Sequence, residues 1–409
     1  MSDKQITPLS EKERLHILDA LRGFALLGIY FVNLNYFSGY KYFSGDAVKA
    51  YSYTANSDEY FNFLIQIFAE GKFYSLFSFL FGLGFAVQMH RTIEKGKPFL
   101  KLYFRRLLIL LFIGLIHTYL IWPGDILTIY AIAAVLLIPF RNASDKSIIT
   151  AAVLLIVSPV LFYAFMMFTG IILGEPFVLW ANELMHQWGI PSQAEIFRSG
   201  DFRTFILSKL PVALLRYSDL FFSSRFPKLW GMFLLGFYFG RNKIFSNPEM
   251  HKGLFKKILV YAGIFGLVFS VITGFYNKFF VTFPVTITGL YSTILQVFAV
   301  HPLAMAYMAG FTLLYLKIKN QNFLNLLAPA GRMALTNYML QSIIGILFFY
   351  HIGLGLGPVG PTIYVPFALI VFTLQVLFSH WWLSKYKFGP LEWLWRSGIY
   401  GKFQEIRKT

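Results

Sequence analysis

No cysteine occurs among the 409 residues of the chain, and only 13% of its residues are charged. The missing cysteine excludes disulfides, thiolate metal sites, a cysteine nucleophile and S-palmitoylation. A soluble domain carries about 25% charged residues, so the small charged fraction excludes a soluble enzyme, a nucleic-acid-binding domain and a disordered chain. The sequence also lacks Gly/Ser-rich linkers, low-complexity tracts and the alternating segments of about ten residues that form a transmembrane β-barrel.

Hydrophobic residues make up 57% of the chain and aromatic residues 19%, more than one soluble core could bury. They gather in runs of about 20 residues, each long enough to cross a hydrocarbon layer of about 30 Å as a helix. The sequence therefore predicts an all-α polytopic membrane protein with about ten transmembrane helices. These helices are expected near 16–37, 60–89, 105–122, 126–140, 148–173, 226–240, 257–276, 285–316, 330–350 and 363–384.

The positions of Lys and Arg predict the orientation of these helices. With a cytoplasmic N-terminus, the segments expected in the cytoplasm carry 24 Lys and Arg, and those expected outside carry 9. Basic residues favour the cytoplasmic side and its anionic lipids, so both termini are expected there, and the net charge of +17 is not attributed to nucleic acid. The predicted organisation is a cytoplasmic tail over 1–15, one membrane domain over 16–384 and a cytoplasmic interfacial tail over 385–409.

Two segments leave the helix count open. The stretch 201–227 contains an apolar and basic sequence, FRTFILSKLPVALLRYSDLFF, which is typical of an interfacial helix or a re-entrant hairpin. The segment 285–316 is long for one crossing and contains Pro302 near its middle. Because proline removes a helical hydrogen bond, a kink or a break is expected there.

Ionisable residues within the apolar runs are the first candidates for a site, since each costs roughly 2.5–3.5 kcal/mol on insertion scales. Asp19 and Arg22 are three residues apart and share a helix face. They form either a local ion pair or a guanidinium that the carboxylate orients toward an anionic group. Asn33, eleven residues after Arg22, is either an interhelical hydrogen-bonding residue or a substrate contact.

The second apolar run carries Glu70 and Lys72, two opposite charges two residues apart. They would face different sides of a regular helix, but both can line a cavity if Gly71 breaks the helix. The same run has a face of small residues that favours close helix packing over chemistry. That face consists of Ser75, Ser78, Gly82 and Gly84.

His117 is a candidate acid, base or nucleophile near the outer end of its helix, because histidine titrates near neutral pH. The alternative is an interfacial histidine beside Tyr119 and Trp122. Asp125 follows at a turn before the next helix, where it is expected to cap that helix. It can also orient His117 by accepting its ring N–H.

Further polar residues lie where helices begin at the cytoplasmic side. Arg105 and Arg106 either mark the start of a helix or bind phosphate. Arg332, Asn337 and Gln341 form a polar stripe with Thr336, and this stripe is expected to face a cavity rather than a partner helix. No Walker A, HExxH or GxSxG motif is present, and no metal site is predicted.

Five separate runs carry a family resemblance that spans about residues 14–400. They are LDALRGFALLGIYFVN, EGKFYSLFSFLFGLGF, the block RR…GLIH…W-GDIL, GRMALTNYMLQS and GPLEWLWR. The chain resembles the YeiB-type family of bacterial membrane proteins of unassigned function. That family is distantly similar to transmembrane acyltransferases, which include acyltransferase-three O-acetylases and the lysosomal glucosaminide N-acetyltransferase. The resemblance implies a multi-pass protein of the bacterial cytoplasmic membrane that takes an acyl group from cytoplasmic acyl-CoA.

The resemblance also implies roles for individual residues. The acyltransferase-three pattern is an Arg, ten residues and then a His; here Arg22 matches the Arg, and Asn33 stands in place of the His. In this interpretation His117, aided by Asp125 or Glu70, serves an extracytoplasmic glycan or lipid acceptor. Acyl-CoA is a co-substrate rather than a tightly bound cofactor. Its phosphates are bound by Arg22, Arg105, Arg106 and Arg332.

A second interpretation from the same residues is a transporter or lipid-handling protein for an anionic small molecule. Pro302 and a weak internal repeat between 23–31 and 231–239 favour it. The passage would be lined by Asp19, Arg22, Glu70, Lys72 and Asn337. Membrane lipids are partners in either interpretation, and the oligomeric state is open.

Overall fold

The computed structural model describes residues 15–43, 54–96, 98–280, 285–318 and 322–408. Within these ranges the chain is helical, and its β pairing consists of two isolated bridges, Gly39 with Val359 and Tyr386 with Arg407. The all-α prediction is confirmed. The predicted N-terminal tail, 1–15, lies outside the described residues except for Leu15.

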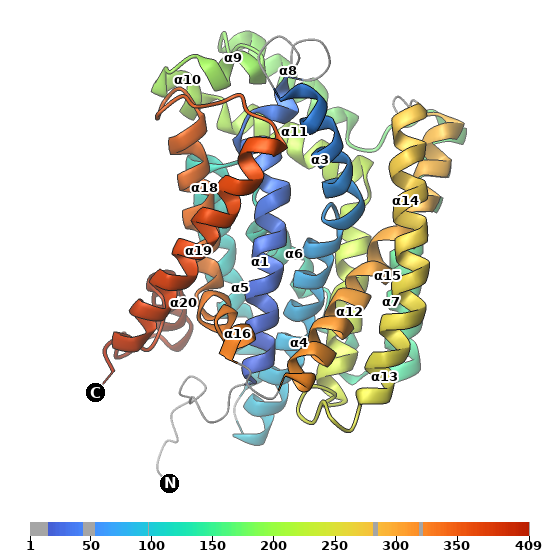
Figure 1. Ribbon diagram of the computed structural model, residues 1–409, viewed down its shortest axis with the longest axis vertical. Helices are drawn as coiled ribbons and strands as arrows, with labels where there is room; N and C mark the ends of the chain where they lie inside the picture. The colour runs from blue at the N-terminus through green and yellow to red at the C-terminus, as the bar shows by residue number, and fades with distance from the viewer. Residues whose placement is uncertain (1–14, 44–53, 97, 281–284, 319–321, 409) are drawn as a thin grey trace.

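The helices follow one another along the chain as Figure 1 labels them. The first half contains α1 (His16–Phe37), η2 (Tyr40–Tyr42), α3 (Ala55–Phe68), α4 (Lys72–Glu94), α5 (Phe99–Ile116), η3 (His117–Ile121), α6 (Leu127–Val135), η4 (Pro139–Asn142), α7 (Asp145–Thr169), α8 (Glu175–Gln187) and α9 (Gln193–Arg198). The second half contains α10 (Phe202–Leu207), α11 (Lys209–Phe222), α12 (Arg225–Arg241), α13 (Lys252–Lys257), η5 (Ile258–Ala262), α14 (Gly263–Phe279), α15 (Ile287–Lys317), α16 (Asn322–Asn325), α17 (Leu327–Arg332), α18 (Ala334–Phe349), α19 (Pro361–Lys385) and α20 (Pro390–Tyr400).

Among the described residues, six helical stretches are long and apolar enough to cross a membrane. They are His16–Phe37, Ala55–Glu94, Asp145–Thr169, Lys252–Phe279, Ile287–Lys317 and Pro361–Lys385. The predicted membrane protein is thus supported, whereas the predicted count of about ten crossings is not confirmed. The run 126–140, for example, is α-helical only over Leu127–Val135 and continues as turns and a short 3-10 helix that begins at Pro139.

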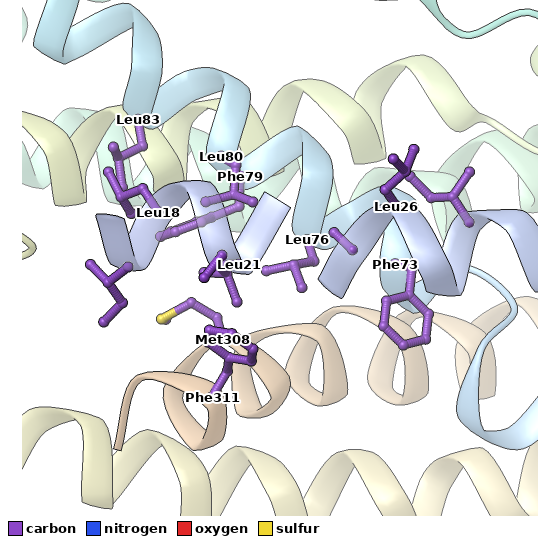
Figure 2. Packing of buried hydrophobic residues seen from close by; sticks show 14 of the residues in the cluster. Leu18, Leu21, Leu26, Phe73, Leu76, Phe79, Leu80, Leu83, Met308 and Phe311 are labelled. Atoms are coloured by element: carbon purple, nitrogen blue, oxygen red, sulfur yellow. The ribbon is translucent and has the colours of Figure 1, made fainter. Parts of the chain in front are cut away.

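The centre of the molecule is an apolar core in which α1 packs against α4 and α15 (Figure 2). Leu18 and Leu21 of α1 are almost completely buried, as are Phe79 of α4 and Met308 of α15. Because lipid tails are as apolar as these side chains, this core is stabilised by close van der Waals packing between helices rather than by exclusion of water. In Figure 1, α1 runs through the middle of the bundle, so residues on its different faces meet several other helices.

Glycines let α4 and α12 approach each other closely. A Cβ atom on Gly82 of α4 would overlap the backbone carbonyl of Phe233, and one on Gly236 of α12 would overlap that of Phe79. Small residues at helix interfaces in membranes allow such contact between backbones. The prediction that the small-residue face serves packing is confirmed for Gly82. Gly84 instead faces Arg22, whose guanidinium would lie 3.9 Å from its Cβ.

The structure resolves the two segments that left the helix count open. Of the kink or break expected at Pro302, the break is wrong, because α15 continues through this residue as one helix. Val297 and Ala299 before Pro302, and Leu303 and Ala304 after it, are buried. Packing on both sides thus outweighs the lost hydrogen bond. The stretch 201–227 forms the short α10 and the amphipathic α11, which pack side by side with α8 and α9 at one end of the bundle (Figure 1).

The bundle has two distinct ends. The α11 end carries α8 to α11, and the opposite α20 end carries α13, α16 and α20 (Figure 1). The segment 385–409 does more than lie along the surface within its described part: α20 packs against α5 and α18, and its Glu392 is buried.

Candidate functional site

The α11 end encloses a cavity of about 280 Å³. Its walls come from α1, α11, the junction of α3 and α4, the turn after η3, and α18. The lining includes Asn33, Tyr36, Glu70, Tyr338 and Tyr350. Cavities of about this size hold small ligands, with a few polar groups that fix their orientation.

A break between α3 and α4 places one predicted residue at this cavity. Gly71 has a φ of 83°, a left-handed conformation that glycine adopts without strain, and it ends the helical path between Ala69 and Lys72. Glu70 consequently lines the cavity. Lys72 is buried elsewhere and donates a hydrogen bond of 2.8 Å to the carbonyl oxygen of Gln66. The expectation that both charges line a cavity is correct for Glu70 and wrong for Lys72.

One face of α11 carries most of the cavity's charge. Lys209, Val212, Arg216 and Asp219 recur at the helical spacing and all line the cavity. Asp219 accepts a 2.6 Å hydrogen bond from Arg216 and lies 3.3 Å from the guanidinium of Arg225. Together with Glu70, the described lining residues comprise three cationic and two anionic side chains.

A chain of three hydrogen-bonded side chains lies next to the cavity, in the wall formed by η3 and α18. Nδ1 of His117 is 2.8 Å from Oδ1 of Asp125, and Nε2 of His117 is 2.9 Å from Oγ of Ser342. His117 and Ser342 are completely buried and Asp125 nearly so. Asp125 therefore orients His117, as the sequence suggested, and His117 is not an exposed interfacial residue.

Local structure explains how His117 and Asp125 meet. His117 begins η3, a π-helical turn that continues α5, and such turns alter the direction of side chains within a helix. Asp125 also caps α6, since its Oδ2 accepts a 2.7 Å hydrogen bond from the backbone N–H of Thr128. The two predicted roles of Asp125, capping and orienting, thus coexist in one carboxylate.

The hydrogen-bond partners of His117 fit one neutral tautomer. An ionised carboxylate can only accept, so Asp125 requires the proton on Nδ1 of His117. Nε2 can then accept a hydrogen bond from the Ser342 hydroxyl, whose Oγ also lies 3.4 Å from a second acceptor, the backbone carbonyl oxygen of Tyr338. The direction of these bonds is the one that prepares a serine oxygen for proton removal.

Tyr338 connects this chain to the cavity. Its ring centroid is 5.2 Å from that of His117, and the residue lines the cavity. Trp122 and Ile126, which flank the turn between His117 and α6, line it too. His117 and Ser342 therefore lie behind the part of the cavity wall that Tyr338 forms.

The predicted arginines gather at the α20 end, away from the cavity. Arg22 and Asp19 form an ion pair of 2.7 Å, and the Arg22 side chain is 28% exposed. Arg106 donates a hydrogen bond to Gln88 and stacks between the rings of Phe81 and Trp395. These contacts fix the guanidinium groups in place while leaving part of the Arg22 surface accessible.

Two more arginines lie at this end. Arg332 is 3.5 Å from the carbonyl oxygen of Lys387, and Arg105 is exposed. Arg396 of α20, which sequence reasoning did not select, interacts electrostatically with Asp19 and Arg332, and burial lowers its pKa. The α20 end thus brings together the cations that were expected to bind phosphate.

The polar stripe on α18 faces a partner helix, not the cavity. Asn337 donates to Ser379 at 3.0 Å, and Gln341 donates to Gln375 at 3.0 Å. Gln375 in turn donates to the backbone carbonyl of Asn337. All four side chains are buried between α18 and α19, so the preference for a cavity was wrong for this pair. Of the predicted polar residues outside the charged set, Asn33 does line the cavity.

Sequence reasoning missed Ser342 and the charged face of α11. Ser342 lies 225 residues from His117, and no local pattern joins them. The spacing of Lys209, Val212 and Arg216 is visible in the run quoted above, but that run indicated only an interfacial helix or a re-entrant hairpin, not a charged cavity wall. Over the described part of the chain, no group of three His, Asp or Glu residues is placed to hold a metal ion.

Comparisons with known proteins give similarities over nearly the whole chain. A family model described as "Protein of unknown function (DUF418)" matches residues 239–402. The uncharacterized protein YxaH of Bacillus subtilis (strain 168) is 34% identical over 419 residues, which cover 98% of this chain and 98% of YxaH. An uncharacterized 39.9 kDa protein in the amylase 3′ region of Bacillus acidopullulyticus is 30% identical, covering 97% of this chain and 96% of the relative. The uncharacterized protein YeiB of Escherichia coli (strain K12) is 26% identical, covering 94% and 96%. No solved structure gives a significant match.

Proposed function

Because the chain belongs to the YeiB-type DUF418 family, for which no function is described, we propose its activity from the geometry of the site. We propose that it is a transmembrane acyltransferase that moves an acyl group from cytoplasmic acyl-CoA to an acceptor in the cavity at the α11 end. The observation that carries the proposal is the buried chain Asp125–His117–Ser342 behind the cavity wall. A purely structural role does not require a histidine that a carboxylate orients toward a serine hydroxyl.

The chemistry proceeds in two steps. Ser342 Oγ attacks the thioester carbonyl while Nε2 of His117 takes its proton; the C–S bond breaks, and the thiolate leaves with that proton as free CoA. An acceptor hydroxyl then attacks the acyl-serine ester, His117 takes the acceptor's proton, and the proton returns to Ser342 as the ester bond to the enzyme breaks. Asp125 stabilises the imidazolium in both steps.

The arginines of the α20 end support a donor site for the CoA phosphates. Arg22 and Arg106 are close enough to interact electrostatically, and each is held by its own contacts. Guanidinium groups bind phosphate in bidentate fashion. His117 follows Arg106 by eleven residues, or about 17 Å along the helix, so an extended CoA arm would carry the thioester from this end toward Ser342.

This proposal fixes an orientation for the bundle. The α20 end faces the cytoplasm of a bacterial cell and the α11 end faces outward, with about ten crossings of the cytoplasmic membrane and both termini inside. The excess of Lys and Arg in the segments at the α20 end supports this orientation. The acceptor, an extracytoplasmic glycan or a membrane lipid, then reaches the cavity from outside the cell or from the outer leaflet.

A transporter for an anionic small molecule is the second candidate, and the cations of the cavity favour it. Lys209, Arg216 and Arg225 would attract an anion at the α11 end. Passage to the cytoplasm would then continue past Tyr338. In that function Ser342 would carry no acyl group, and this difference separates the two candidates.

The experiment is a search for the acyl-serine intermediate. The full-length protein, purified in detergent, is incubated with acetyl-CoA and with a long-chain acyl-CoA and examined by peptide mass spectrometry. We expect an acyl group on Ser342, no acylation in Ser342→Ala, and acylation slowed about 10³-fold or more in His117→Ala.

Two matched variants act as controls. Ser379 is another buried serine of the same helix pair, and His380 is an exposed histidine on α19. Ser379→Ala and His380→Ala should be acylated at the wild-type rate. Wild-type protein that stays unmodified and releases no CoA with either donor would refute the acyltransferase and leave the transporter.

A further inference from the structure

Two cationic side chains of the cavity at the α11 end carry N–H groups that no acceptor within the described residues satisfies. Lys209 is 95% buried, and within the described residues its Nζ has no ion pair and no hydrogen bond; it lies 3.2 Å from the centroid of the Phe205 ring. Nε of Arg216 is buried and has no hydrogen-bond partner either. Both residues line the cavity.

Buried cations are normally paired, because removing a charge from water costs several kcal/mol. The neighbouring carboxylate, Asp219, is already used by Arg216 Nη1 and by Arg225. Burial accordingly lowers the pKa of Lys209 well below its usual range, as expected for an amine without a counter-charge. A contact with the face of Phe205 replaces only part of the lost hydration.

Apart from Arg225 and the carboxylates of Glu70 and Asp219, the rest of the described cavity lining is neutral and is rich in aromatic side chains. Tyr36, Trp122, Tyr338 and Tyr350 contribute rings, and Asn33 contributes an amide. Such a lining accommodates the apolar and hydroxyl-bearing parts of a small molecule, while the α11 face awaits a group of opposite charge.

We infer that the cavity binds an acceptor that carries an anionic group, a phosphate or carboxylate, which Lys209 and Arg216 hold while Tyr338 separates it from His117 and Ser342. The ligand's role as an acyl acceptor rests on the proposed function. The binding of an anion does not depend on that chemistry. The anionic group can belong to a soluble molecule or to a lipid headgroup, since both present the same oxygens.

Binding is measured by thermal unfolding and calorimetric titration of the purified full-length protein. The soluble probes are glycerol 3-phosphate and, as its uncharged partner, glycerol. The lipid probes are nanodiscs of phosphatidylglycerol and of phosphatidylcholine. We expect at least one anionic probe to stabilise the protein more than its uncharged or zwitterionic partner, and the arm that succeeds identifies the source of the anion.

The variants assign this binding to the α11 face. Lys209→Met should weaken binding of the anionic probe at least tenfold, and Lys209→Arg should restore most of it. Lys278→Met is the matched control: Lys278 lies on α14, is exposed and is paired with Glu59. This variant should bind the anionic probe as tightly as the wild type. Unfolding temperatures without any probe show whether each variant is folded.

The same titration in His117→Ala separates this inference from the proposed function. If His117→Ala binds the anion and no acyl-serine forms in the wild type, acyl transfer is refuted and the anion site stands. If the wild type prefers neither anionic probe, or if folded Lys209→Met binds as tightly as the wild type, the anion site is refuted whatever the outcome of acylation.

Discussion

Glu392 and Asp125 are buried carboxylates that cap helices, and they differ in what else they contact. Both oxygens of Glu392 serve the first turn of α18: Oε1 accepts from the backbone N–H groups of Leu335 and Thr336, and Oε2 accepts from the Thr336 hydroxyl at 2.6 Å. Asp125 uses one oxygen for Thr128 at the start of α6 and gives the other to His117.

This difference shows why the burial of a carboxylate does not by itself indicate a catalytic role. Glu392 satisfies N–H groups that would otherwise lack acceptors at a helix end, and its contacts account for its burial completely. Asp125 performs the same task with one oxygen and fixes the tautomer of an ionisable ring with the other. A substitution that keeps the cap but removes the charge therefore separates the two kinds of carboxylate.

The largest effect is expected for Asp125→Asn. The amide oxygen can still accept from Thr128, so α6 stays capped and the unfolding temperature changes little. The amide N–H₂ would face Nδ1 of His117 and favour the tautomer with the proton on Nε2, which cannot take the Ser342 proton. Acylation of Ser342 should fall about 10³- to 10⁴-fold, the size of effect known for such a change in a serine triad.

Glu392→Gln is the matched control for that measurement, because it makes the same change in the cap without a histidine. Its acylation rate should equal that of the wild type. If folded Asp125→Asn is acylated at the wild-type rate, Asp125 acts only as a helix cap, and the proposed difference between Asp125 and Glu392 is refuted.

The next largest effect is a loss of stability in Glu392→Ala. Two backbone N–H groups and a hydroxyl of α18 would lose their acceptor in a buried position, at a cost of about 3 kcal/mol from the lost cap and the unsatisfied donors. Urea or thermal unfolding in detergent measures it. Glu405→Ala, which removes an exposed glutamate paired with Lys387, should leave stability nearly unchanged. Equal losses in the two variants would show that the cap contributes nothing.

Some of this architecture was predictable from the sequence, and the reason is local spacing. The runs of apolar residues predicted a helical membrane protein, and the short separation of eight positions from His117 to Asp125 allowed their contact to be expected. Gly71 was correctly identified as a possible break. Each of these inferences concerns neighbours along the chain, where helix geometry limits the possible arrangements.

The remaining features depend on which helices pack together, and one chain's pattern does not determine that. The spacing of Asn337 and Gln341 fits a cavity and a partner helix equally well; the matching pair Gln375 and Ser379 on α19 decides in favour of the helix. Ser342 gains its place only because α18 packs beside η3. A lone serine in an apolar helix carries no signal of that contact.

The smallest effect expected is a difference in pH dependence between Glu392 and an exposed glutamate. Burial raises the pKa of Glu392 above its usual range, although the hydrogen bonds from α18 oppose the shift. Between the ordinary glutamate pKa and this raised value, the folded protein binds a proton more readily than the unfolded chain, so this group's contribution to stability falls as the pH rises. Gln cannot ionise, so the unfolding temperature of Glu392→Gln should rise relative to that of the wild type as the pH rises through this interval.

Glu405 is the control, because the hydrogen bond from Lys387 lowers its pKa. Its contribution to stability is present above the ordinary glutamate pKa and is lost as the pH falls, so the unfolding temperature of the wild type should rise relative to that of Glu405→Gln as the pH rises. Parallel pH profiles for both variants would mean that Glu392 is as accessible to water as Glu405, which would remove the burial on which its role as a cap depends.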